Sequence, residues 1–99
     1  MFRIPVDKAT IADFCRRWHI TEFSLFGSVL RDDFRPDSDV DVLVVFAPDT
    51  ELGWEDWEAM EQELEAIFGR PVDLVEKEAV RNPFRRRDIL KTHQVVYAA

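Results

Sequence analysis

The sequence predicts an α/β fold in which a small mixed β-sheet is flanked by helices. Two observations support this fold class. Short segments have the apolar runs or the apolar–polar alternation of strands, and between them lie segments whose apolar residues recur every three to four positions, as in helices. The 99 residues contain no repeat, linker or low-complexity tract, so we expect one domain spanning residues 1–99.

The first half of the chain predicts one helix and two strands. A helix is expected over residues 7–18, because Asp7 can cap it and its apolar residues fall on one stripe. Residues 21–28 alternate as a short strand does, and residues 29–34 could form a brief helical turn. Residues 40–47 form the clearest strand of the sequence.

The second half begins with the longest predicted helix, over residues 54–68. Gly69 follows it at the position of a C-cap glycine. Its stripe is apolar apart from Glu61. Trp54 and Trp57 lie on this stripe, so we expect them to pack in the core; if the stripe is not fully covered, they would form a docking surface instead.

Three further elements complete the predicted fold. Residues 71–75 form a third strand. Asn82 can cap a helix that starts at Pro83 and extends to about residue 92. Residues 94–97 could add a last short strand.

Composition narrows the possible functions. The net charge is −7, from 13 Lys and Arg against 20 Asp and Glu, which argues against direct nucleic-acid binding and favours a basic partner or one that arrives with metal ions. The apolar runs are too short for a membrane span, and the N-terminus lacks a signal-peptide pattern. A cytoplasmic protein without membrane contact is therefore expected, and its single cysteine, Cys15, fits a reducing compartment.

Two aspartates, Asp39 and Asp41, open the strand at residues 40–47. Side chains alternate along a strand, so both should point to one face, with Cα atoms roughly 6.5 Å apart. Carboxylates this close repel each other unless a cation lies between them. Mg²⁺ prefers oxygen ligands and often combines one or two carboxylates with substrate phosphates, so the pair predicts a magnesium site at the mouth of the sheet.

A possible phosphate site lies upstream, at Gly27-Ser28. A glycine between a strand and a helical turn lets backbone N–H groups approach a phosphate closely, and the Ser28 hydroxyl adds another polar contact. Arg31 could bind an oxyanion with its forked donors, or pair with a neighbouring aspartate on the surface.

These motifs together resemble the DNA polymerase β-like nucleotidyltransferase superfamily, and in particular its minimal nucleotidyltransferases. The family pattern is Gly-Ser-x-x-Arg, then Ser-Asp-x-Asp, then a third acidic residue on a later strand. The chain departs from it at Asp32, where the minimal group commonly has glycine. The residues that match are Gly27, Ser28, Arg31, Ser38, Asp39, Asp41 and Asp73.

The resemblance implies specific roles for these residues. Asp39 and Asp41 would hold two Mg²⁺ ions, and Asp73 would complete the catalytic metal site and help to activate the acceptor hydroxyl. Gly27 and Ser28 would hold the β- and γ-phosphates of ATP, and Arg31 and Ser38 would belong to the same nucleotide site. Asp73 could alternatively be an edge-strand residue that discourages strand pairing.

The resemblance also implies a partner. Minimal nucleotidyltransferases are often paired with HEPN-type ribonuclease toxins and act as antitoxins, some by transferring AMP from ATP to a tyrosine of the toxin. Such a protein adenylyltransferase is the first hypothesis. Two alternatives remain: an antitoxin that binds and occludes its toxin with weak or no catalysis, and a nucleotidyltransferase that acts on a small molecule or RNA end.

One sequence feature fits none of these roles directly. Four arginines form a basic cluster in an acidic protein: Arg81, Arg85, Arg86 and Arg87. The cluster predicts either a solvated helix face or a contact with an acidic partner or RNA.

Overall fold

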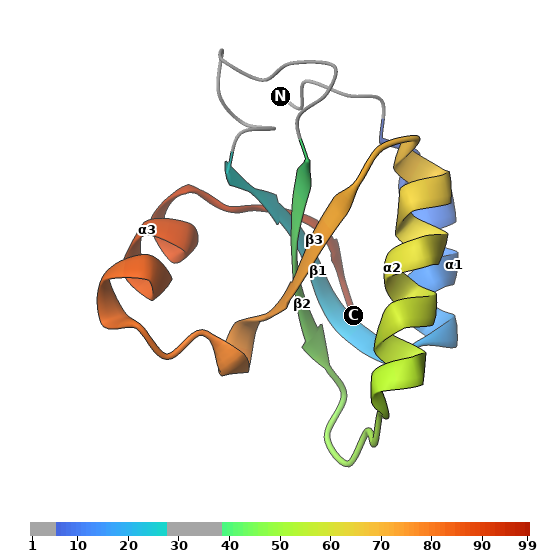
Figure 1. Ribbon diagram of the computed structural model, residues 1–99, viewed down its shortest axis with the longest axis horizontal. Helices are drawn as coiled ribbons and strands as arrows, with labels where there is room; N and C mark the ends of the chain where they lie inside the picture. Colours follow the sequence, from blue (N-terminus) through green and yellow to red (C-terminus); the bar gives the residue numbers. More distant parts are fainter. Residues whose placement is uncertain (1–5, 28–38) are drawn as a thin grey trace.

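The computed structural model describes residues 6–27 and 39–99. The described residues form three α-helices, four strands and a short 3-10 turn, and Figure 1 shows their arrangement. In order they are α1 (Lys8–Arg17), β1 (Ile20–Phe26), β2 (Val40–Phe46), α2 (Trp54–Phe68), β3 (Val72–Glu76), the 3-10 turn η2 (Lys77–Ala79), α3 (Pro83–Thr92) and β4 (Gln94–Ala98).

The four described strands form one mixed sheet in the order β3-β2-β1-β4. Strand β1 runs antiparallel to both β2 and β4, whereas β2 and β3 are parallel. Parallel neighbours need a long crossover, and α2 supplies it between β2 and β3. The predicted α/β architecture with a mixed sheet is confirmed.

Helices cover the sheet on both faces. In Figure 1, α1 and α2 lie side by side on one face and α3 lies on the other. Alternation along β2 divides its side chains between two buried clusters: Val40, Val42 and Val44 join the cluster beneath α1 and α2, and Leu43 joins Ile89 of α3. Asp41 therefore belongs to the face on the α3 side.

The helix ends follow the local signals in the sequence. The Asp7 carboxylate accepts hydrogen bonds from the N–H groups of Ala9 and Thr10, at 3.0 and 3.3 Å. Asn82 caps α3 in the same way, and Gly69 ends α2 with a left-handed φ of 71°. The predicted bounds of α2 are identical to the observed ones, residues 54–68.

Other predictions need correction. Strand β1 ends at Phe26, so Gly27 follows the strand instead of belonging to it. Strand β3 begins one residue later than predicted and ends at Glu76, because parallel pairing with β2 fixes its ends. The expected core packing of Trp54 is wrong: its side chain is 74% exposed, at the first turn of α2. The helical turn predicted over residues 29–34 lies outside the described residues.

No helix among the described residues is both long and apolar enough to pass through a membrane.

Candidate active site

Two of the three predicted acids lie opposite each other in the sheet. Parallel pairing of β2 with β3 places Asp41 directly across from Asp73. Their neighbours Val40 and Val72 are buried beneath α1 and α2, so both carboxylates belong to the opposite face. Adjacent strands lie about 4.8 Å apart, and two carboxylates facing the same way at that spacing repel each other unless a cation compensates them.

Asp39 lies immediately before β2, two residues from Asp41. Its side chain is exposed, as is that of Asp73, whereas Asp41 is partly buried. The backbone N–H of Val40 donates a 2.9 Å hydrogen bond to the Pro71 carbonyl and so fixes the start of β2 against the start of β3. All three predicted acids are therefore carried by the same end of two paired strands.

Gly27 approaches this site closely. It follows β1 with a φ of 75°, a conformation that side-chain-bearing residues rarely adopt. A Cβ atom at this position would lie 2.1 Å from Oδ2 of Asp41, far inside any van der Waals contact. Phe26, the residue before Gly27, pairs with Asp41 across the antiparallel strands and explains this proximity. The site thus requires glycine at position 27 for two separate reasons.

The remaining predicted site residues, Ser28, Arg31 and Ser38, lie outside the described residues, as does Asp32. In residues 6–27 and 39–99, no group of three or more His, Cys, Asp or Glu side chains is arranged to hold a metal ion. The donors that are described still suit magnesium: oxygen ligands from Asp41 and Asp73 at facing positions, with Asp39 close along the chain. Their roles as ligands stay predictions.

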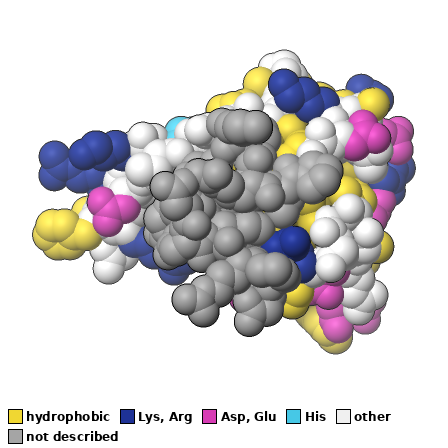
Figure 2. All heavy atoms as spheres, turned by 90° about the horizontal axis from the view of Figure 1, so that it is seen from above, with side chains coloured by type: hydrophobic (Ala, Val, Ile, Leu, Met, Phe, Trp, Pro, Cys, Tyr) yellow, Lys and Arg dark blue, Asp and Glu magenta, His cyan; other side chains and the backbone are white. Residues whose placement is uncertain are grey.

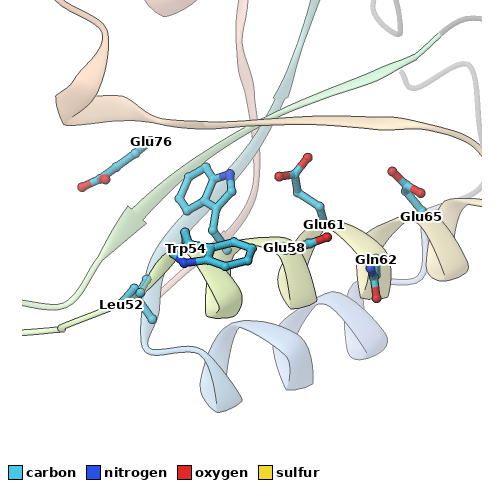
Figure 3. Close-up of a pocket in the computed structure, with 9 residues that line it drawn as sticks. Leu52, Trp54, Glu58, Glu61, Gln62, Glu65 and Glu76 are labelled. Carbon is cyan, nitrogen blue, oxygen red and sulfur yellow. The ribbon is translucent and has the colours of Figure 1, made fainter.

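A groove lies between α2 and β3, on the other face of the sheet from these carboxylates, and sequence reasoning did not identify it. Figure 3 shows side chains that line it. Its volume is about 750 Å³. Glutamates of α2 line it, and the pKa of Glu61 is raised, first by burial and then by Glu65, Asp73 and Glu58. The sequence signal was Glu61 itself, the one acid on an otherwise apolar stripe.

The basic cluster lies at and before α3, on the other face of the sheet from the groove. Figure 2 shows Lys and Arg side chains gathered at that end of the molecule. Arg86 is partly buried and donates a 2.8 Å hydrogen bond to the Lys77 carbonyl, whereas Arg81, Arg85 and Arg87 are exposed. Only one member of the cluster therefore has an evident structural role.

Comparison with known proteins shows that the chain belongs to a class of nucleotide-transfer enzymes. The model of the nucleotidyltransferase domain family matches residues 8–96, and this chain belongs to that family. Within the family it is a minimal nucleotidyltransferase similar to protein adenylyltransferases.

Two relatives show which proteins of this family the chain is similar to. The chain is 38% identical over 66 residues to the protein adenylyltransferase MntA of Thermococcus cleftensis, covering 67% of this chain and 65% of that protein. It is 29% identical over 73 residues to MJ1379 of Methanocaldococcus jannaschii, which is named as a candidate protein adenylyltransferase, covering 74% of this chain and 73% of that protein.

Solved structures share the fold. One described as a candidate minimal nucleotidyltransferase superimposes with a TM-score of 0.70 at 29% identity, over 88% of this chain and 86% of that one. A toxin–antitoxin structure with AMP-PNP gives a TM-score of 0.74 at 22% identity, over 95% and 75%. The structure of a tri-AMPylated HEPN toxin of Shewanella oneidensis in complex with an MNT antitoxin gives a TM-score of 0.65 at 21% identity, over 93% of this chain and 70% of that chain.

Proposed function

We propose that this chain transfers AMP from ATP to a tyrosine hydroxyl of a HEPN-type ribonuclease toxin and thereby acts as its antitoxin. The observation that carries the proposal is the facing pair Asp41 and Asp73, with Gly27 packed against Asp41. The similarity to protein adenylyltransferases supports AMP as the transferred group, and the toxin complexes of similar fold support the partner.

The proposed reaction is a single in-line displacement. The acceptor oxygen bonds to the α-phosphorus of ATP while the bond from that phosphorus to the bridging oxygen of the β-phosphate breaks, and diphosphate leaves. Asp73, the most exposed member of the facing pair, accepts the hydroxyl proton. Asp39, Asp41 and Asp73 would hold two Mg²⁺ ions, which when bound neutralise charge on the phosphates and on the entering and leaving oxygens.

The nucleotide would lie on the Gly27 side of the site. A residue with no side chain lets the backbone after β1 approach the phosphates, and the left-handed φ of Gly27 turns the chain sharply there. Ser28, Arg31 and Ser38 complete the proposed nucleotide contacts. Modification of the toxin would add a bulky anion near its RNA-cleaving residues and repel the phosphates of its substrate.

Occlusion without catalysis is a second candidate, favoured by one observation. Trp54 is 74% exposed beside the acidic groove, as expected for a surface that binds a basic protein stoichiometrically. The two candidate functions differ in whether they need the aspartates: AMP transfer requires Asp39 and Asp41 to bind magnesium, whereas occlusion does not.

The deciding experiment uses the D39N/D41N double variant beside the original chain. Each is co-expressed with its HEPN-type partner and incubated with Mg²⁺ and each of the four nucleoside triphosphates. The intact mass of the partner and its ribonuclease activity are then measured. We expect the original chain with ATP to add the mass of AMP to the partner and silence it, and the variant to do neither. Neutralisation by the variant without any mass gain would establish occlusion.

A further inference from the structure

The groove between α2 and β3 has aromatic side chains at one end and acidic side chains along the rest of its length. Figure 3 shows Trp54 and Glu76 near one end and the carboxylates of α2 following along the helix. The side chains that define it are Trp54, Trp57, Glu58, Glu61, Glu65 and Glu76.

The two tryptophans differ in how firmly they are held. Trp57 is partly buried and packs on Phe46, with ring centroids 6.2 Å apart. Trp54 remains 74% exposed, although an indole buries more apolar surface than almost any other side chain when it is covered. An exposed tryptophan beside a fixed one offers an apolar anchor to a partner.

The acids are spaced for a long cationic ligand instead of a single ion. Glu58, Glu61 and Glu65 follow one another along α2 at intervals of three and four residues, where like charges repel. Within the part of the chain that the structure describes, no three acids converge on a metal position. Separate positive charges on an extended peptide would neutralise each glutamate in turn.

The other wall of the groove favours an extended ligand. Strand β3 is at the end of the described strand order, so no described strand pairs with its outer edge. The backbone groups on such an edge can pair with an added strand. The groove runs for about 16 Å along α2 between residues 54 and 65, which matches about five residues of extended peptide.

The groove comes within electrostatic range of the candidate active site at the edge of the sheet, although the two lie on opposite faces: Asp73 contributes to the raised pKa of Glu61, which lines the groove. Because α2 is the crossover that precedes β3, its C-terminal half lies beside the start of β3, where Asp73 is located. We propose that this groove binds an extended basic segment of the protein that accepts the nucleotide, with an apolar side chain on Trp54 and arginine or lysine side chains along Glu58, Glu61 and Glu65. The inference rests on the proposed function, because it assigns the groove to the acceptor of that reaction.

A second copy of this chain fits the groove less well. Seven of the ten Lys and Arg residues that the structure describes lie on α1 and α3, and a helix cannot pair with a strand edge. Nucleic acid is disfavoured because its phosphates would meet at least four glutamates. An extended basic protein segment satisfies the charge and the backbone edge together.

The test uses two fluorescein-labelled peptides, one alternating arginine and valine and ending in tyrosine, the other with glutamate in place of arginine. Their binding to the chain is followed by fluorescence anisotropy at two salt concentrations. The groove variants are E58K/E65K and W54A. The matched controls are E78K/D88K, which changes net charge equally at exposed positions outside the groove, and F84A, which removes an aromatic side chain that is 76% exposed on α3.

We expect the arginine peptide to bind saturably and the glutamate peptide not to bind. Either groove variant should weaken this binding about tenfold or more, and higher salt should weaken it too. Neither control variant should change it. Absence of saturable binding, or equal weakening by the controls, would overturn the inference. So would sedimentation of the chain as a dimer that E58K/E65K dissociates, because a second copy would then occupy the groove.

A second readout separates this inference from the proposed function. With Mg²⁺ and ATP, the KM for the protein acceptor should rise about tenfold in the groove variants while kcat stays the same. AMP transfer with an unchanged KM would refute docking but leave the proposed function intact. Peptide binding in the groove without AMP transfer to any acceptor would refute the proposed function but leave the binding of a basic segment in the groove intact.

Discussion

Replacement of Gly27 by alanine tests the geometry of the candidate site most directly. The new Cβ would lie 2.1 Å from Oδ2 of Asp41, and it must separate to at least 3.0 Å, so either Asp41 or the backbone shifts by about 1 Å. A displacement of that size at a catalytic group reduces rates by about 100-fold. The φ of 75° adds backbone strain of about 1 kcal/mol in alanine.

Gly69 provides the matched control. Its φ of 71° is nearly the same, but nothing lies within 4 Å of a Cβ built there. G69A should therefore lose about 1 kcal/mol of stability from strain alone, or about 4–8 °C in Tm, with AMP transfer per folded molecule unchanged. G27A should lose at least as much stability and also about 100-fold in transfer rate.

The two variants are compared by thermal unfolding and by the rate of AMP incorporation into the acceptor under saturating ATP and Mg²⁺. If G27A transfers AMP as fast as G69A, Asp41 does not need its observed position, and its assignment to the active site is refuted.

Two further predictions concern titratable groups in the core and the groove. Because the pKa of Glu61 is raised in the folded protein, its ionisation destabilises the fold at neutral pH. E61Q should therefore raise the Tm at pH 7, and this gain in Tm should vanish below about pH 4.5. Thermal unfolding measured across that pH range checks the prediction. An equal gain at every pH would exclude this cause. Burial raises the pKa of the Cys15 thiol to about 12, so iodoacetamide at pH 8 should modify Cys15 only after denaturation, as read by intact mass. Modification of the native protein would contradict the packing of α1.

The local elements were predictable because their signals are local. Asp7, Gly69 and Asn82 each mark a helix end through contacts with backbone groups a few residues away. Strand ends were less predictable, since β1 and β3 end where pairing with β2 ends. Trp54 shows the limit of periodicity, which gives the face of a helix but not how far that face is covered.

The sequence by itself determined the mixed α/β fold, the helix ends and the acids at positions 39, 41 and 73 as candidates for one site. Only the tertiary structure decided that Asp73 faces Asp41, that the Gly27 backbone touches Asp41, and that α2 leaves an acidic groove open beside the edge of β3. Capping and periodicity act over a few residues, whereas these arrangements depend on strand order and register, which contacts between distant segments establish.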